Sequence, residues 1–370
     1  MKIAFISTIL GYPWGGADTL WTHAAEAASE RGDKLFLSVS PAVAAHPRIA
    51  QLQACGAQIH LRTPPAAPTL PVRALRKLGF PSSQTDHLLG ALQEFRPDRV
   101  IISLGGTYDL VLHASWLTWF AASRTPYHLI ANWQQEHPVL APDQLELARH
   151  ALTFAERLYF VSSRNLAVTR RHLLAALPQA LVVQNPLRWR ATDVTPWPEA
   201  PGPLLATVSR LDHGKGIRLL LHSLAELITD ADWRLAIYGQ GPHEQALRDA
   251  AASLGLATRV SFRGYVKELS AIWREQQLFV SPAIDDGVPM TIPEALLCAR
   301  PVLATCVGGA EDWIQPGRTG FLCPAPTVPL LTASLREAFA AHARWPAMGV
   351  EAAKAAAGHY RPDDFRQLLS

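Results

Sequence analysis

Short apolar runs alternate with segments of helical periodicity along the whole chain of 370 residues. In the first half, the apolar runs expected to form buried strands are residues 2–7, 35–38, 58–61, 99–103, 127–131, 157–162 and 180–184. In the second half they are residues 204–209, 234–238, 260–263, 278–281 and 301–305. This alternation predicts βα units and parallel sheets, a doubly wound α/β fold.

Between residues 177 and 203 the alternation stops, because six prolines interrupt any helix. We therefore expect two domains, which also suits the length at about 150 residues per domain. The predicted division is a first doubly wound domain over 1–185, a linker over 186–203 and a second domain over 204–345. A helical tail over 346–370 is expected to pack back on the first domain. Ligands should bind beyond the carboxyl ends of the strands, in a cleft that the two domains face.

Composition excludes several classes of protein. Hydrophobic residues are 49% and charged residues 18%, which is typical of a globular chain, and the net charge of +3 is too weak to argue for nucleic acid. No apolar run reaches the ~18 residues of a membrane span. The four cysteines have no metal-like spacing, so we expect reduced thiols, a cytoplasmic location and no metal site.

The loop from Ser281 to Glu294 follows a predicted strand and leads into a helix expected to begin near Pro293. Its carboxylates, Asp286 and Glu294, together with backbone N–H groups, would suit a polyol such as a sugar, which needs both donors and acceptors. The alternative is that Glu294 only compensates the charge of the helix N-terminus.

A second loop, residues 209–216, combines Arg210 and Lys215 with two glycines. A guanidinium, an ammonium and a closely approaching backbone favour a diphosphate at a helix N-terminus. The sequence does not match the Walker pattern of ATPases. An ordinary surface turn is the alternative.

Glycines follow other strands at the expected ligand edge. They are Gly241 after one strand, the Arg263–Tyr265 turn after the next, and Gly15 with Gly16 before the first helix. The paired glycines would suit an anion, but a dinucleotide GxGxxG is absent, which argues against a nicotinamide oxidoreductase.

The chain resembles the retaining glycosyltransferases of family four, the glycosyl transferases group 1, in an ordered set of motifs. In chain order these motifs are GG, SRL-x-x-GKG, YGQGP, FRGYV, DDGVPMTIPEALLCARPVLAT, GG and GRTGF. The resemblance covers nearly the whole chain and is most specific over 204–322. The opening YPWGGADTLW is similar to a bacterial subgroup. The resemblance implies the GT-B fold.

It also implies a metal-independent hexosyltransferase without a cofactor, which moves a sugar from a nucleotide-diphosphate sugar to a hydroxyl acceptor. UDP-sugars are expected first and GDP-sugars next. Arg210 and Lys215 would neutralise the leaving diphosphate, Asp286 would hold the donor sugar and Glu294 the ribose. The remaining donor-site residues implied are Gly15, Gly16, Gly241, Arg263, Tyr265, Val266, Gly287, Val288, Pro289 and Met290.

Two departures from the family pattern matter. Asp286 stands where the family's E-x7-E pattern has glutamate, and Asn132 stands where many relatives have a histidine, with His137 as the nearest other polar group. Asn132 and His137 are the predicted acceptor-side residues. These departures motivate one alternative, a catalytically weak partner subunit that binds sugar nucleotides, and a GT-B-fold epimerase is another.

The stretch 71–80 mixes Arg73, Arg76 and Lys77 with Phe80 and other apolar residues. It is expected either to contact an anionic membrane at the inner face or to be a solvated basic loop. The acceptor would be a sugar, a lipid-linked group or a small molecule in bacterial glycan, glycolipid or natural-product biosynthesis.

Overall fold

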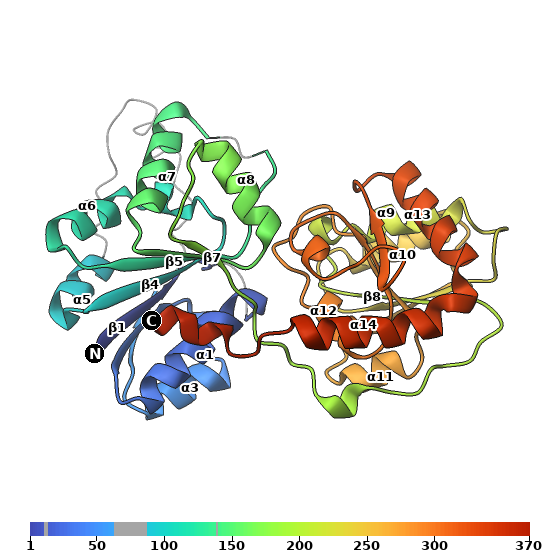
Figure 1. Ribbon diagram of the computed structural model, residues 1–370, viewed down its shortest axis with the longest axis horizontal. Helices are drawn as coiled ribbons and strands as arrows, with labels where there is room; N and C mark the ends of the chain where they lie inside the picture. The colour runs from blue at the N-terminus through green and yellow to red at the C-terminus, as the bar shows by residue number, and fades with distance from the viewer. Residues whose placement is uncertain (11–13, 63–86, 138–139) are drawn as a thin grey trace. The chain divides into compact units, whose positions relative to one another are not determined.

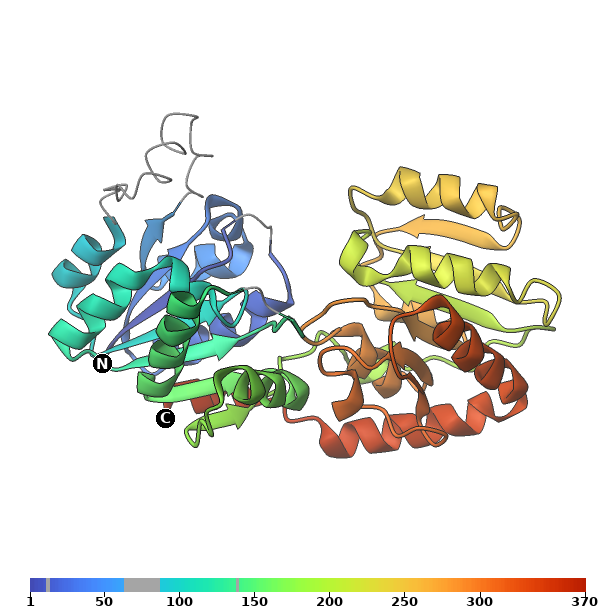
Figure 2. The ribbon, with the colours of Figure 1, turned by 90° about the horizontal axis from the view of Figure 1, so that it is seen from above.

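The computed structural model describes residues 1–10, 14–62, 87–137 and 140–370, and they form two compact units (Figures 1 and 2). The first unit consists of Met1–Val161, Leu166–Pro186 and Asp363–Ser370. The second unit consists of Ser162–Asn165 and Leu187–Pro362. Each unit is an α/β layer structure around its own sheet.

The sheet of the first unit has the strand order β3-β2-β1-β4-β5-β6-β7, and all its neighbouring strands are parallel. Its central strands are almost continuously apolar because helices cover both faces. The strands are β1 (Lys2–Ser7), β2 (Lys34–Val39), β3 (Gln58–Leu61), β4 (Arg99–Leu104), β5 (Tyr127–Ala131), β6 (Arg157–Phe160) and β7 (Ala180–Val182).

Figure 1 shows α1 and α3 on one face of this sheet and α6 and α7 on the other. On the face covered by α6 and α7, one apolar cluster packs these helices against the strands. Trp116 and Phe160 are among its buried members. The helices of the first unit are α1 (Gly16–Glu30), α2 (Pro41–Ala44), α3 (Pro47–Ala54), α5 (His87–Phe95), α6 (Ala114–Ser123), α7 (Pro142–Phe154), α8 (Ser163–Leu173), and the 3-10 turns η1 (Asp109–Leu112) and η6 (Asp364–Leu369).

The sheet of the second unit has the order β10-β9-β8-β11-β12-β13 and is also parallel. Its strands are β8 (Leu204–Val208), β9 (Arg234–Tyr238), β10 (Val260–Gly264), β11 (Leu278–Ser281), β12 (Val302–Thr305) and β13 (Gly320–Cys323). The sequence analysis does not predict the last strand, which begins with a glycine, a residue that is depleted in strands.

Two apolar clusters cover the two faces of this sheet. Trp233 and Trp345 lie in the cluster under α9, α10 and α13, and Trp273 lies in the cluster under α11, α12 and α14. Figure 2 shows α9 and α10 running alongside the strands. The helical elements are η2 (Ala191–Asp193), η3 (His213–Lys215), α9 (Ile217–Ala225), α10 (Glu244–Ser253), α11 (Leu269–Trp273), α12 (Thr291–Leu297), η4 (Ala310–Asp312), α13 (Val328–Ala340), η5 (His342–Arg344) and α14 (Trp345–His359).

The structure differs from the predicted division in two places. Residues 187–203 belong to the second unit rather than to a free linker, because the buried Arg300 donates hydrogen bonds to the carbonyls of Thr195 and Pro196. The predicted tail over 346–370 is divided between the two units. Helix α14 packs on α12 of the second unit, and only Asp363–Ser370 belong to the first unit. There Tyr159 donates to the Gln367 carbonyl at 2.6 Å. Among the described helices none is long and apolar enough to cross a membrane.

Candidate active site

Each sheet reverses its strand order at one position, between β1 and β4 in the first unit and between β8 and β11 in the second. Doubly wound sheets bind ligands at this switch point, beyond the carboxyl ends of the strands. In the second unit, the loops that leave β8 and β11 are the two chemistry-bearing loops of the sequence, Ser209–Gly216 and Pro282–Met290. Their geometry therefore decides what the site can bind.

The backbone locks these two loops together. The Gly214 carbonyl accepts hydrogen bonds from the N–H groups of Ile284 at 2.8 Å and Asp285 at 3.2 Å. Gly216 has φ +65°, and a Cβ there would lie 1.8 Å from the Pro282 carbonyl oxygen. Glycine is required at this position both for its left-handed conformation and for the close approach of the second loop.

Opposite charges meet across the joined loops. Lys215 Nζ lies 2.5 Å from Asp286 Oδ2, and the two side chains are 22% and 13% exposed. Arg210 Nη2 pairs with Asp212 Oδ2 at 2.9 Å and is 55% exposed. The structure thus brings together Lys215 and Asp286, which the sequence predicts from separate motifs. The guanidinium of Arg210, in the same loop as Lys215, is partly exposed to solvent.

The loop after β12 shapes the other side of Asp286. The Gly287 carbonyl accepts from the Gly309 N–H at 2.8 Å, and a Cβ at Gly308 would lie 2.1 Å from that carbonyl oxygen. A Cβ at Gly309 would lie 2.5 Å from a methyl group of Val288. These contacts explain why the glycine pair follows β12.

The backbone donors expected near Asp286 are fewer than the sequence suggests. The Gly287 N–H already donates to Asp286 Oδ1 at 2.9 Å, and Pro289 has no N–H. Met290 is the N-cap of α12, which begins at Thr291, two residues before Pro293. The Thr291 hydroxyl donates to the Val208 carbonyl at 3.3 Å, so α12 starts against the end of β8.

Glu294, in the first turn of α12, is 2% exposed. Its oxygens accept hydrogen bonds from Arg188 Nε at 3.1 and 3.2 Å. Burial raises the pKa of the Glu294 carboxyl, and the charge of Arg188 acts in the opposite direction. The sequence analysis does not single out Arg188, which stands two residues after Pro186 in the proline-rich segment.

The other predicted donor-site residues lie on neighbouring loops. A Cβ at Gly241 would lie 2.4 Å from the Leu211 carbonyl, so the β9 loop packs against the β8 loop. Arg263 forms an ion pair with Glu275 at 2.5 Å. Beyond β10, Tyr265 is 64% exposed, whereas Val266 is partly buried against the core.

The switch point of the first unit is built from a hydroxyl and a carboxylate. Thr8 donates to Asp109 Oδ2 at 2.6 Å, and the Gly105 N–H lies 2.9 Å from Thr8 Oγ1 and 3.0 Å from Asp109 Oδ2. These contacts join the loops after β1 and β4. Neither Thr8 nor Asp109 is singled out by the sequence analysis.

Of the two predicted acceptor-side residues, Asn132 is buried at the end of β5 and His137 is exposed. Asn132 Nδ2 donates to Ser103 Oγ at 3.0 Å and to the Leu104 carbonyl at 2.8 Å, while its Oδ1 has no hydrogen-bond partner among the residues that the structure describes. The structure therefore gives these two side chains different environments.

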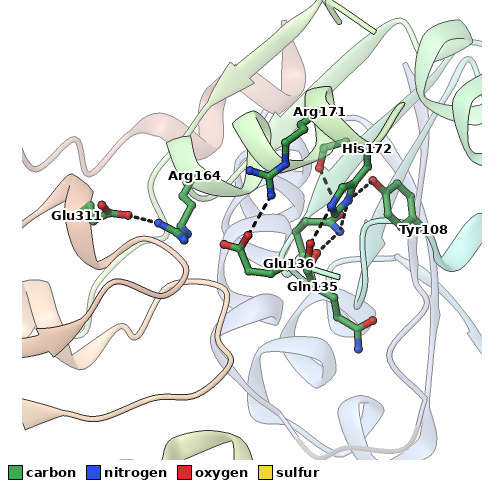
Figure 3. A network of polar contacts seen from close by, with 9 residues as sticks. Tyr108, Gln135, Glu136, Arg164, Arg171, His172 and Glu311 are labelled. Atoms are coloured by element: carbon green, nitrogen blue, oxygen red, sulfur yellow. Dashed lines mark hydrogen bonds and ion pairs between the residues drawn. The ribbon is translucent and has the colours of Figure 1, made fainter. Parts of the chain in front are cut away.

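Helix α8 holds the loop after β5 (Figure 3). His172 Nε2 donates to the Glu136 carbonyl at 2.8 Å, which leaves Nδ1 to face the Tyr108 hydroxyl at 3.3 Å. Arg171 pairs with the Glu136 carboxylate at 3.2 Å. Burial raises the pKa of Tyr108 to about 12, so its hydroxyl stays protonated at neutral pH.

The anion site expected at Gly15 and Gly16 is already occupied by a side chain of the protein. The Gly15 N–H donates to Asp18 Oδ2 at 2.9 Å, and Asp18 is 2% exposed. Because this carboxylate takes up the N–H at the start of α1, the start of α1 is less open to an external anion than the glycine pair suggests.

Two further expectations concern a membrane contact and a metal site. Arg73, Arg76, Lys77 and Phe80 lie outside the described residues. Among the residues that are described, no three His, Cys, Asp or Glu side chains are grouped to hold a metal ion.

Comparison with known proteins connects this geometry to a family. Residues 202–340 match the family model described as glycosyl transferases group 1. The chain is 28% identical over 244 residues to 2-deoxystreptamine glucosyltransferase from Streptomyces kanamyceticus, covering 62% of this chain and 60% of the relative. It is 33% identical over 158 residues to a GDP-mannose-dependent phosphatidylinositol monomannoside mannosyltransferase from Mycolicibacterium smegmatis, covering 40% and 41%. These matches span 60% of the relatives' own length or less.

Solved structures match over the whole chain. The crystal structure of HepE from Anabaena in complex with UDP superposes with a TM-score of 0.72 at 18% identity, covering 100% of this chain and 98% of that one. Sucrose-phosphate synthase from Thermosynechococcus elongatus gives 0.72 at 16% identity, covering 100% and 97%. At such identities the likeness concerns the fold. The match to the glycosyl transferases group 1 family thus lies in the second unit, and the two parallel α/β units together have the GT-B fold.

Proposed function

We propose that this protein is a glycosyltransferase that takes a sugar from a nucleotide-diphosphate donor and transfers it to a hydroxyl acceptor. The observation that carries the proposal is the pairing of Lys215 with Asp286 across the two loops of the second switch point. One loop supplies cations for a diphosphate, and the other supplies a carboxylate for sugar hydroxyls, within one hydrogen bond of each other.

In this proposal the diphosphate lies against Lys215 and Arg210, which stabilise the negative charge that develops as it leaves. The bond from the anomeric carbon to the phosphate oxygen breaks, and the bond to the acceptor oxygen forms on the same face. The acceptor's proton passes to the departing phosphate. Asp286 orients the sugar through its hydroxyls, and Glu294 accepts hydrogen bonds from the ribose.

The relatives support a uridine or guanosine donor. HepE was crystallised with UDP, and the mycobacterial relative is named as GDP-mannose-dependent. We place UDP-sugars first and GDP-sugars next. The acceptor side belongs to the first unit, with Asn132 nearest the end of β5.

A thermal-shift panel of UDP-, GDP-, ADP- and dTDP-sugars tests the proposal. A donor at 100 times its Kd should stabilise the chain by about 2.7 kcal/mol. We expect one nucleotide to raise Tm, and both Arg210→Ala and Glu294→Ala to remove the shift. Arg248→Ala, which breaks a surface pair with Glu244 on α10, is the matched control and should keep it. No shift with any donor would contradict the proposal and favour the partner-subunit alternative.

A further inference from the structure

Arg188 reaches Glu294 from a segment far away in the sequence. It is the second residue of the second unit's segment that begins at Leu187, and its Nε donates to both oxygens of the Glu294 carboxylate, 106 residues further along the chain. Its side chain is 40% exposed, whereas that of Glu294 is 2% exposed. The guanidinium is thus the outer member of the pair and the carboxylate the inner one.

A buried carboxylate needs such a partner to stay ionised. Transfer of an isolated charge out of water is costly, and the group otherwise takes up a proton. A protonated carboxyl carries an O–H donor and accepts hydrogen bonds only weakly, whereas a carboxylate offers acceptor sites on both oxygens. Arg188 Nε contacts both oxygens, and the Arg188 backbone N–H also hydrogen-bonds to the carboxylate, so a pair of neighbouring hydroxyls would use the remaining acceptor capacity of the two oxygens.

We propose that Arg188 is a positioning residue of the nucleotide site, which holds Glu294 as an ionised double acceptor for the vicinal hydroxyls of the ribose. The inference rests on the proposed function, because it takes Glu294 as the residue that meets the ribose. The inference adds Arg188, which lies in neither of the two loops Ser209–Gly216 and Pro282–Met290, to the residues of the site.

Few other charges face Glu294. Asp193 from η2 acts on it with the opposite sign to Arg188, and Cys298 lies one turn along its own helix. The strands under α12, β11 and β12, carry no titratable side chain. From α14, Glu351 pairs with Arg318. Arg188 is therefore the cation that opposes the effect of burial on the Glu294 pKa.

The test is the Kd for UDP and GDP between pH 6 and 9 in the wild type, Arg188→Gln and Arg188→Lys. The ratio of variant to wild-type Kd cancels the titration of the nucleotide itself. In Arg188→Gln the Glu294 pKa rises further, so the ratio should be about tenfold or more at pH 6 and shrink as pH rises. Arg188→Lys keeps the charge and should bind like the wild type across this range.

Two other variants complete the test. Arg190→Gln changes a neighbouring arginine that pairs with Asp193 and Glu268, and should leave the ratio near one at every pH. Glu294→Gln is permanently neutral and should bind weakly, with a ratio to the wild-type Kd that does not fall as the pH rises. This variant tests the proposal even if Arg188→Gln does not fold.

A ratio independent of pH would overturn the inference, and so would tighter binding by Arg188→Gln, which would mean that Arg188 competes with the ribose. Wild-type affinity in Glu294→Gln would overturn it as well. Absence of binding by the wild type would instead overturn the proposed function together with this inference, so the two failures are distinguishable.

Discussion

At the switch point of the second unit, a lysine from one loop meets an aspartate from the next, and glycines let the two backbones touch. At the switch point of the first unit, the same two positions of the fold are joined by the Thr8 hydroxyl and the Asp109 carboxylate. The strand order that creates the crevice is alike in the two units, but the charges are not. The topology therefore supplies a place for a ligand, and the side chains decide its chemistry.

This difference in charge would suit different ligands at the two switch points. Cations beside a carboxylate favour a phosphorylated sugar, whereas a hydroxyl beside a carboxylate favours an uncharged polyol. The predictions below test whether the donor chemistry resides in the second unit alone.

The largest expected effect follows the loss of the loop cation. Lys215→Met removes one charge-stabilising group from the leaving diphosphate, so the transfer rate should fall about 10²–10³-fold. Arg248→Met on α10 is the matched control. Steady-state kinetics with the donor that the thermal-shift panel selects measure both, and a loss below about threefold in Lys215→Met would contradict the assignment of the diphosphate to this loop.

The next effect concerns the contact between the two loops. Gly216→Ala combines a left-handed backbone with a Cβ 1.8 Å from the Pro282 carbonyl, so it should cost about 3 kcal/mol or more in unfolding free energy. Gly255→Ala is a matched control, because its φ is +73° but a Cβ there meets nothing within 4 Å. We expect only about 1–2 kcal/mol for it, measured by urea unfolding. Equal costs would mean that the loops are not in contact.

The smallest effect is expected in the first unit. Thr8→Val removes the hydrogen bond to Asp109 and should cost about 1–2 kcal/mol in unfolding free energy. Nucleotide Kd should not change. Thr118→Val, at an exposed helix position, should stay within about 0.5 kcal/mol of the wild type. If Thr8→Val weakened nucleotide binding tenfold, the comparison between the two units would fail.

Much of this fold follows from sequence because most of the central strands are buried apolar runs of ordinary length. The predicted bounds of 2–7, 58–61, 127–131, 234–238 and 278–281 match those observed. The loops Ser209–Gly216 and Pro282–Met290 are also predictable, since parallel strands place their carboxyl ends at one edge. Their proximity follows from topology and needs no contact information.

The pairing of charges could not be predicted in the same way. Lys215 and Asp286 lie 71 residues apart, and Arg188 and Glu294 lie 106 apart, so no local pattern joins them. One contact could have been predicted from the sequence. Asp18 stands three residues after Gly15, and at this spacing an acidic side chain accepts a hydrogen bond from the backbone N–H of the helix N-cap. That spacing would have argued against an open anion site at the glycine pair.

The most direct test of the central claim compares a nucleoside diphosphate with the monophosphate of the same base by calorimetric titration. If Lys215 and Arg210 bind the diphosphate, the wild type should bind the diphosphate about tenfold or more tightly than the monophosphate, and Lys215→Met should lose most of that preference. Equal affinity for the two nucleotides in the wild type, or an unchanged preference in Lys215→Met, would contradict the account.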